Sequence, residues 1–568
     1  MIISLSFLIA LLLFCSTANG FLNHISVRSD LHSGRGRLIS NSDVRVYASN
    51  PWDSFFSSFG GAKPKATKAS SIEKVDSLVV GSGISGSTAA FYIFKSGADV
   101  LLTETRDVVG GNLISKTKDG FLWEEGPNSF QPNPAILRFA KDLGMIDELV
   151  LADPTLPRFV FWEDKLYALP GGLGDLPTFS LLSWPGKIRA GLGALGFIAP
   201  KPKEEESVQD FVTRHLGEET FTKIIDPFVS GVYAGDPQKL AMAAALRKVK
   251  NLEDLGIGPG ILDGAIVRIN QIAAEKKKNK ERDADLPTIP GGSLGSFQYG
   301  LQSLPLKVKE LMGERVRVSH KLTNVAKTED GDWLCTFETP RGRKQIQCTS
   351  LLVTAPSYAT SAILGGETGV LPAASQLEKV YYPPVASVTV AYPNSAFKKP
   401  LVGFGHLIPR AMKVRTLGTI WSSSLFPGRA PEGYTMLLNY IGGARDAGIA
   451  DLSETEIVDQ VHADVKKILL KDDAEKPRLL GCKVWPRAIP QYEKGHLAII
   501  QKIEEAMKDT PGLILGGNYK TGVAFGDCVQ FGADVSKDVL SYINSKKSDN
   551  KKESDIDSVV EEKEKVAA

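Results

Sequence analysis

The spacing of apolar and polar positions changes several times along the chain from about Lys74 onward. Residues 75–80 and 99–103 form short apolar runs typical of buried strands, and residues 87–95 between them have helical spacing. Both patterns recur, with strands predicted over 315–318, 333–337 and 512–517 and helices over 207–215 and 454–470. The sequence shows no internal repeat and no sustained heptad, so it predicts a mixed α/β fold.

The first fifty residues predict a targeting leader. Residues 2–15 form an uncharged apolar run, too short to cross a bilayer, and the small residues 16–20 follow it, as in a cleaved signal peptide. No Lys or Arg precedes the run, which departs from that pattern. Residues 21–50 hold four arginines, six serines and no glutamate, the composition of a transit peptide.

The sequence thus predicts two successive targeting segments, a signal peptide over 1–20 and a transit peptide with linker over 21–73. They resemble the bipartite leaders of algae whose plastids lie inside extra membranes. The resemblance implies a location in the plastid (chloroplast), at the thylakoid or envelope membrane. Secretion followed by a disordered pro-segment is the alternative. At the other end, residues 546–568 are rich in Lys, Glu, Asp and Ser and predict a disordered, charged tail.

Composition narrows the class of protein. A chain of 568 residues exceeds one ordinary domain, and 43% hydrophobic with 23% charged residues is typical of a folded protein. Lys and Arg number 67 against 65 Asp and Glu, so no chain-wide positive field favours nucleic acid. The cysteines are scattered and the histidines lack the HxxxH or HExxH spacing, which leaves a metal site without support.

A glycine-rich turn follows the first predicted strand and begins the first helix. It reads Gly81, Ser82, Gly83, Ile84, Ser85 and Gly86. In a dinucleotide-binding βαβ unit, the first glycine permits the tight turn, the second lets the backbone approach a pyrophosphate, and the third lets the helix pack against the strand. Glu104 ends the second strand about 20 residues later, where a carboxylate binds a ribose hydroxyl. The sequence therefore predicts a dinucleotide site.

A second glycine pair, Gly110 and Gly111, follows Glu104 closely and resembles flavoproteins of the amine oxidase type, which favours FAD over NAD. Residues 123–129 and the C-terminal segment 512–524 are similar to stretches of that family that contact the flavin. The resemblance implies a Rossmann-like FAD-binding domain built from both ends of the chain. The cofactor-binding residues that it adds to the glycine turn are Glu104, Thr105, Gly110, Gly111, Asn112, Gly126, Pro127, Asn128, Ser129, Leu322, Gly517, Asn518, Val523, Ala524 and Phe525. Leu322 is placed against adenine through its backbone.

Within that superfamily, residues 157–162, 226–237, 403–405, 416–427, 439–443 and 488–492 resemble the oxygen-dependent protoporphyrinogen oxidase family, especially its plastid type. The resemblance runs from about Val75 to Ile543. It implies the oxidation of protoporphyrinogen IX to protoporphyrin IX, with three O₂ reduced to three H₂O₂, in haem and chlorophyll biosynthesis. Hydride transfer to flavin N5 requires positioning, so no residue is assigned as a catalytic acid or base.

The substrate-binding residues that follow from the resemblance are Arg158, Phe404, Gly231, Val385 and Ala386. Arg158 is expected to hold a propionate, since a guanidinium pairs with a carboxylate through two hydrogen bonds. A surface ion pair is the alternative for Arg158, and ordinary packing is the alternative for the other four. Another amine-oxidase-type enzyme, such as a carotenoid desaturase or polyamine oxidase, and a flavin-free protein that escorts small GTPases are the rival functions.

The resemblance also implies the layout of the domains. Residues 74–148, 290–354 and 490–545 are assigned to the FAD-binding domain, 149–258 to a helical membrane-binding insertion, and 259–289 with 355–489 to a mainly β substrate domain. Residues 171–200 are apolar but broken by Pro and Gly, which favours insertion into a membrane surface over crossing, with a buried core segment as the alternative. Relatives suggest a homodimer.

Overall fold

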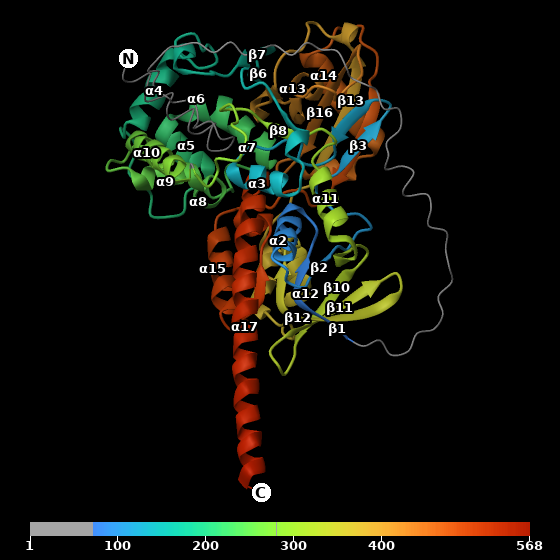
Figure 1. Ribbon diagram of the computed structural model, residues 1–568. Coiled ribbons are helices and arrows are strands. Elements are labelled where there is room, and N and C mark those ends of the chain that lie inside the picture. Colours follow the sequence, from blue (N-terminus) through green and yellow to red (C-terminus); the bar gives the residue numbers. More distant parts are fainter. Residues whose placement is uncertain (1–71, 280, 568) are drawn as a thin grey trace.

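The computed structural model describes residues 72–279 and 281–567, so the leader predicted over 1–71 lies outside the described residues. Figure 1 shows a lower half built on one sheet and an upper half in which a helical lobe lies beside a second sheet. The first sheet has seven strands in the order β10-β11-β12-β1-β2-β9, with β18 also paired to β12. Their bounds are β1 (Glu73–Val80), β2 (Val100–Thr103), β9 (Val316–Arg317), β10 (Lys321–Lys327), β11 (Trp333–Thr339), β12 (Gly342–Val353) and β18 (Leu513–Leu515).

Strand β1 is the centre of the first sheet and the predicted turn follows it directly. It pairs in parallel with β12 on one side and with β2 on the other, and its residues 77–80 are fully buried. Since β18 also pairs in parallel with β12, strands from the two ends of the chain have their carboxyl ends at one edge. The strand order changes direction there, which is where open α/β sheets bind ligands.

Helices cover both faces of this sheet. One face packs against α2 (Ile84–Lys95), α3 (Pro134–Asp142), α11 (Ser303–Met312) and α17 (Phe525–Ala567). The other packs against α12 (Ser357–Leu364), η6 (Pro372–Lys379) and α15 (His496–Met507), and the short α16 (Asn518–Thr521) follows β18. Residues 357–382 therefore belong with the first sheet, although the sequence assigned them to the substrate domain.

The second sheet also has seven strands, in the order β17-β13-β16-β15-β14-β6-β7. Its core packs against α14 (Glu454–Ile468), and α13 (Ser422–Leu425) lies at one end. The strands are β6 (Arg158–Trp162), β7 (Lys165–Ala168), β13 (Val385–Pro393), β14 (Gly405–Leu407), β15 (Thr416–Ile420), β16 (Tyr434–Gly442) and β17 (Arg478–Trp485). Because β6 pairs in parallel with β14, the first part of the predicted helical insertion extends this sheet.

The helical lobe has its own apolar core. Its helices are α4 (Trp184–Ala194), α5 (Val208–Leu216), α6 (Glu218–Thr220), α7 (Asp226–Tyr233), α8 (Met242–Ala245), α9 (Arg247–Leu255) and α10 (Leu262–Asn279), with η3 (Leu173–Asp175) and η4 (Phe221–Ile225) between them. Ile261 and Ala265 are buried in this core, so α10 packs with the lobe and not with the substrate domain to which the sequence assigned it.

Two small sheets and several single turns complete the fold. Strand β3 (Ser115–Lys118) pairs with β4 (Phe121–Glu124), and β5 (Leu149–Leu151) pairs with β8 (Gly295–Phe297). The single turns are η2 (Ile146–Glu148), η5 (Gly313–Arg315), η7 (Asn394–Ala396), η8 (Arg410–Met412) and η9 (Ala447–Asp451).

The charged tail over 546–567 is helical and continues α17, in contrast to the predicted disorder. Figure 1 shows α17 running along the first sheet and then projecting well beyond it. The tail lacks proline and glycine, and Lys and Glu are good helix formers, so a helix that begins in the body of the protein can continue through it.

Candidate cofactor and substrate site

The glycine turn after β1 is held tightly between two strands. Gly81 has a φ of +100° and its N–H donates to the Thr103 carbonyl at 2.9 Å. A Cβ at Gly86 would lie 2.0 Å from the Gly81 carbonyl oxygen, so only glycine lets α2 come this close to the turn. The first and third glycines of the predicted motif are therefore both required by the backbone of the turn and of the helix that follows it.

The second glycine, Gly83, faces open space. A Cβ added there would meet no atom within 4 Å, whereas a Cβ at Gly111 would lie 2.9 Å from the Gly83 Cα. The N–H of Gly110 donates to the carbonyl and hydroxyl oxygens of Ser82 at 3.1 and 3.2 Å. The two glycine turns, separate in sequence, thus form one cradle whose open side can accept a pyrophosphate, which fits FAD.

Two helix N-termini point toward this cradle. Gly83 is the N-cap of α2, and α17 lies beside α2 in the same direction, with Cys528 next to Ser85 and Gly532 next to Thr88. Each helix N-terminus carries about half a positive charge and favours an anion. The N-terminal and C-terminal parts of the chain therefore both contribute to the same anion site.

The Glu104 carboxylate is buried and holds the glycine turn. Its Oε2 accepts from the Ser82 N–H at 3.1 Å and from the Ser82 hydroxyl at 2.6 Å, and its Oε1 accepts from the Arg106 N–H at 3.0 Å. The N–H groups of Ser319 and His320 donate to the Arg106 and Glu104 carbonyls. Leu322 lies two residues further along with its side chain in the core, so residues 319–320 lie closer to Glu104 than Leu322 does.

Residues 126–129, which the sequence placed against the flavin, join the first sheet to the second. The Tyr440 hydroxyl on β16 donates to the Gly126 carbonyl at 3.0 Å and accepts from Asn128 Nδ2 at 3.3 Å. Trp485 Nε1 on β17 donates to the Glu125 carbonyl at 2.8 Å. Sequence reasoning noted the motif around Tyr440 but gave neither aromatic residue a role.

The remaining predicted cofactor residues lie around this cradle. Phe525 is buried and stacks on Phe130 with ring centroids 5.1 Å apart. Gly517 has a φ of +115° at the end of β18. Thr105, Asn112, Pro127 and Ala524 are exposed, while Ser129, Asn518 and Val523 are half-buried.

Arg158 and Phe404, two predicted substrate residues, are brought together by the pairing of β6 with β14. Arg158 lies opposite Gly405, and its guanidinium carbon is 5.5 Å from the centroid of the Phe404 ring. On the neighbouring helix α7, a Cβ at Gly231 would lie 2.3 Å from a methyl group of Leu407, so the glycine lets α7 pack on β14.

Val385 and Ala386 point to opposite faces of β13, because side chains alternate along a strand. Val385 packs with Ala234 and Leu417, next to Tyr440, on the face toward α7. Ala386 is fully buried on the other face, in the core under α14. The structure therefore brings Val385 to the predicted site and does not bring Ala386 there.

A buried carboxyl group lies below the second glycine turn. Glu124 Oε1 accepts from the Leu301 N–H at 2.8 Å and Oε2 accepts from the Ser115 hydroxyl at 2.7 Å. Burial raises the pKa of Glu124 to about 7, against the opposing effect of these hydrogen bonds and of the positive charge on Arg429. Gln302 completes the support of the turn by donating to the Val109 carbonyl at 3.0 Å.

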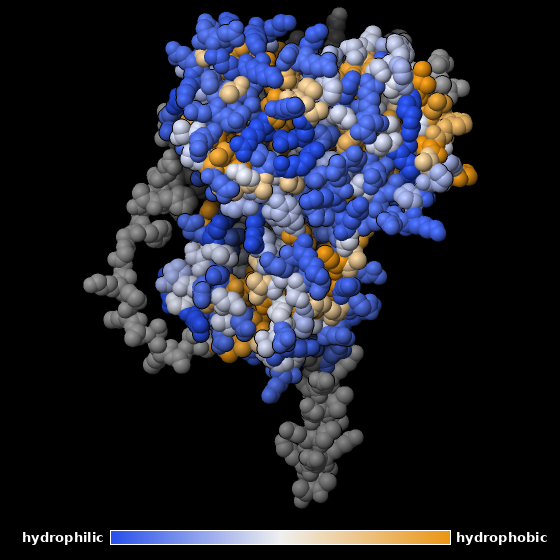
Figure 2. Space-filling model, turned by 180° about the vertical axis from the view of Figure 1, so that it is seen from behind, coloured by the Kyte–Doolittle hydropathy of each residue, from blue (hydrophilic) through white to orange (hydrophobic). Residues whose placement is uncertain are grey.

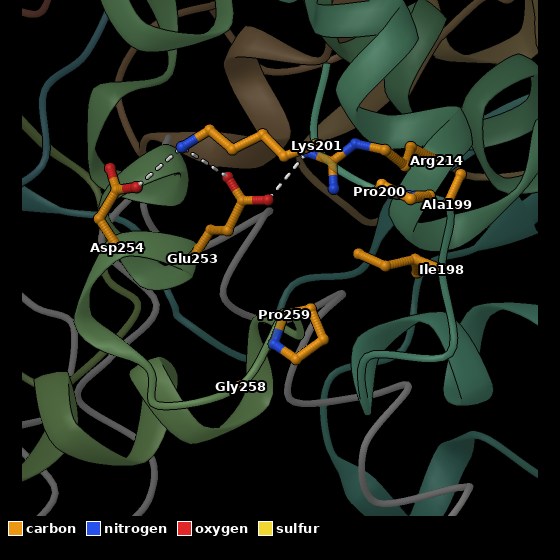
Figure 3. Close-up of a pocket in the computed structure, with 9 residues that line it drawn as sticks. All are labelled: Ile198, Ala199, Pro200, Lys201, Arg214, Glu253, Asp254, Gly258 and Pro259. Carbon is orange, nitrogen blue, oxygen red and sulfur yellow. Dashed lines mark hydrogen bonds and ion pairs between the residues drawn. The ribbon is translucent and has the colours of Figure 1, made fainter. Parts of the chain in front are cut away.

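A cavity of about 410 Å³ lies away from these residues, in the helical lobe. Figure 3 shows Lys201 reaching Glu253 and Asp254 across it, at 3.7 and 3.4 Å, with Arg214 on the same wall. These opposite charges neutralise one another, and no predicted site residue lines this cavity.

The fold and the glycine cradle define a FAD-binding flavoprotein. The sequence profile described as "Flavin containing amine oxidoreductase" matches residues 84–540, and the chain belongs to that family. Its cofactor is therefore FAD, as the sequence predicted.

Within the family, the chain is 45% identical over 484 residues to "Protoporphyrinogen oxidase 1, chloroplastic" of Spinacia oleracea, covering 83% of this chain and 85% of the relative. It is 46% identical to "Protoporphyrinogen oxidase, chloroplastic" of Oryza sativa subsp. japonica, covering 85% and 91%. "Coproporphyrinogen III oxidase" of Bacillus subtilis is 29% identical, with 82% and 98% covered. The chain thus also belongs with the protoporphyrinogen oxidases, and the spinach and rice relatives are both named chloroplastic.

Solved structures support the fold. A protein from Exiguobacterium sp. 255-15 superposes with a TM-score of 0.65 at 21% identity, covering 83% of this chain and 99% of that one. "Cyclohexylamine Oxidase from Brevibacterium oxydans IH-35A" gives 0.58 at 15% identity, covering 83% and 99%. The amine oxidase type of α/β fold predicted from the sequence is confirmed.

Proposed function

We propose that the chain oxidises protoporphyrinogen IX to protoporphyrin IX and reduces three O₂ to three H₂O₂ per product. The observation that carries this proposal is the 45% identity over 484 residues to a protoporphyrinogen oxidase named chloroplastic. The product serves haem and chlorophyll biosynthesis. The carotenoid desaturase, polyamine oxidase and GTPase-escort alternatives have no comparable support.

Bound FAD would supply the acceptor for hydride equivalents from the macrocycle. The chain's own residues then have the task of binding and orienting the substrate. Arg158 is suited to a propionate because a guanidinium forms two charge-assisted hydrogen bonds with a carboxylate. Phe404, next to it, offers a ring face to a pyrrole, and Val385 with Leu417 provides an apolar wall on the α7 side.

The cofactor and substrate sites share one wall. Tyr440 bonds the Gly126–Asn128 segment on the cofactor side and packs near Val385 on the substrate side. Substrate placed between Arg158 and Val385 therefore lies next to the segment that we propose passes the flavin ring.

We also propose that the helical lobe rests on a membrane surface in the plastid, at the thylakoid or envelope membrane, and that the chain reaches it by the bipartite leader. Trp184, Ile188, Phe197 and Ile257 are exposed on this lobe. Figure 2, seen from behind, shows apolar side chains gathered at the outer edge of the lobe. No helix in the described parts of the chain is both long and apolar enough to span a membrane. Other apolar residues of 171–200 are buried, so this segment contributes both to the core of the helical lobe and to its exposed apolar surface.

The function is tested by expressing residues from 72 onward and following porphyrin fluorescence in air with protoporphyrinogen IX, alongside an anaerobic control. Oxygen-dependent fluorescence with H₂O₂ at three per porphyrin supports the proposal. If coproporphyrinogen III were oxidised faster than protoporphyrinogen IX, the assigned substrate would be coproporphyrinogen III. A protein that binds flavin, and is therefore yellow, but oxidises neither porphyrinogen would contradict the proposed function. Sedimentation of the same protein with liposomes tests the membrane surface, and sedimentation velocity tests the homodimer.

A further inference from the structure

A second, much smaller cavity lies between β4 and the strands β15 and β16 of the second sheet. It has a volume of about 20 Å³, room for one molecule the size of water. Trp123 and Glu124 line it from β4 and Ile420 from the end of β15, and its other lining residues are Leu122, Asn128, Ser422, Leu425, Phe426, Arg429, Met436 and Leu438. Asn128 belongs to the predicted cofactor segment, and Ile420 packs in the same cluster as Phe404. The cavity therefore borders both the proposed cofactor segment and the cluster that contains Phe404.

Arg429 brings a buried positive charge to this cavity. Its residue is 5% exposed, and its Nη2 donates to the Ser296 hydroxyl at 2.6 Å and to the Phe297 carbonyl at 3.2 Å. Its Nη1 is buried without a hydrogen-bond partner, although such groups are nearly always satisfied. An unsatisfied donor on a buried cation is costly, so its persistence calls for a ligand.

The charge on Arg429 is only weakly compensated. Across the described residues, no carboxylate lies within 4 Å of its guanidinium, and the nearby Glu124 has a pKa raised to about 7 by burial. The guanidinium carbon lies 5.5 Å from the centroid of the Phe426 ring, which adds a modest attraction. A small anion in the cavity would gain strongly from this charge because the surroundings are of low polarity.

A second unsatisfied atom belongs to Asn128, which lines the same cavity. Asn128 Oδ1 is buried without a partner, while its Nδ2 is engaged by Tyr440. A ligand that accepts from Arg429 and donates to Asn128 would satisfy both. Water does so, and so does a protonated oxygen anion.

We propose that this cavity is the dioxygen site and that Arg429 is a catalytic residue of the oxidative half-reaction, holding the oxygen species as it gains negative charge. This rests on the proposed function only in that a reduced flavin must be reoxidised by O₂. Each O₂ takes up two electrons and one proton from the reduced cofactor and a second proton from the medium, and leaves as H₂O₂. The first electron makes O₂ an anion, which is the stage that a fixed positive charge stabilises.

The first test separates the two half-reactions in the holoenzyme. Arg429→Met removes the charge at similar volume, and Arg429→Lys retains it. Arg478→Met is the matched control, since Arg478 also stacks on a phenylalanine, Phe121, but is exposed. Photoreduction of the flavin dispenses with porphyrinogen, so a wrong substrate assignment leaves this test intact. We expect reoxidation by O₂ to slow about 100-fold in Arg429→Met, and by less than about 10-fold in Arg429→Lys. Reoxidation of Arg429→Met at the unmodified rate would overturn the proposal.

The second test needs no turnover. Fluoride, an anion of about the size of water, is titrated into the oxidised holoenzyme and followed by the change in flavin absorbance. We expect saturable binding in the unmodified protein and in Arg478→Met, and none in Arg429→Met. Should Arg429→Met fail to fold, the unmodified protein alone tests the proposal. Saturating fluoride must then slow reoxidation, and a failure of fluoride to bind or to slow it rejects the dioxygen site.

Discussion

The carboxylate of Asp226, at the start of α7, accepts a hydrogen bond from Nη2 of Arg445 at 2.6 Å, across 219 residues of sequence. Its other oxygen accepts from the N–H of Arg410 at 3.1 Å. Asp226 is buried, whereas Arg445 lies in the loop after β16. This one carboxylate therefore ties the helical lobe to the second sheet, and with it fixes α7 and Gly231 against β14.

Asp226→Asn should weaken both the fold and the binding of substrate. Breaking a buried ion pair costs about 3 kcal/mol, because it leaves the partner charge uncompensated. Since α7 carries Gly231, we also expect KM for protoporphyrinogen to rise more than kcat falls. Denaturant unfolding and steady-state kinetics measure the two effects. Asp285→Asn, at an exposed ion pair with Arg138, is the control and should leave both nearly unchanged.

Arg158→Ala should raise KM for protoporphyrinogen roughly 10- to 100-fold, because the binding free energy of a charge-assisted pair with a carboxylate would be lost. The dimethyl ester of the substrate lacks the carboxylates, so the variant and the unmodified enzyme should have similar KM values for it. Arg478→Ala serves as the control. Equal KM values for the free acid in the variant and the parent would remove Arg158 from the substrate site.

Gly83→Ala and Gly86→Ala should fail in different ways. A Cβ at Gly83 meets open space in the protein alone, so the apoprotein should keep its thermal stability while its affinity for FAD falls. A Cβ at Gly86 lies 2.0 Å from the Gly81 carbonyl oxygen, so that variant should lose stability with or without FAD. Thermal unfolding of both apoproteins and a fluorescence titration with FAD make the comparison. A destabilised Gly83→Ala apoprotein would contradict the cradle.

The buried carboxyl group of Glu124 should make the free energy of unfolding depend on pH. Its pKa is about 7 in the fold against an ordinary value of 4.5, so the folded state holds the proton more tightly than the unfolded state. The stabilising contribution is complete below about pH 4.5 and is lost as pH rises through about 7, by about 3 kcal/mol in all. The groups that face this carboxyl are the Ser115 hydroxyl, the Leu301 N–H and the Arg429 guanidinium.

Glu124→Gln has no proton to lose, so its unfolding free energy should rise relative to that of the parent between pH 5 and pH 8. Chemical denaturation at several pH values measures the difference. Glu505→Gln on the exposed face of α15 is the control. Parallel pH curves for Glu124→Gln and the parent would show that Glu124 is ionised throughout.

The sequence predicted the cofactor half of the fold well because its signals are local. The strand, glycine turn and helix over residues 73–95 lie in one continuous stretch, and glycine requirements at Gly81 and Gly86 leave a readable pattern. Predictions that depend on long-range packing fared less well. Nothing near residue 386 shows that Val385 faces α7 while Ala386 faces α14, because the strand is buried on both faces.

Residues that join distant segments were missed for the same reason. Tyr440 and Trp485 are ordinary strand aromatics in sequence, and only the meeting of β16 and β17 with residues 125–128 reveals their hydrogen bonds. The hydrogen bonds between the Glu104 carboxylate and Ser82 were missed as well, because the spacing of residues does not show a contact between a strand end and a turn.

The placement of β1 and β18 on either side of β12 has a consequence for biogenesis. The cradle at Gly83 gains its second helix N-terminus only when residues beyond 525 have docked, so the cofactor cannot be fully held by a chain still being synthesised. Full retention of FAD therefore has to wait until the whole chain is complete and α17 has packed along α2.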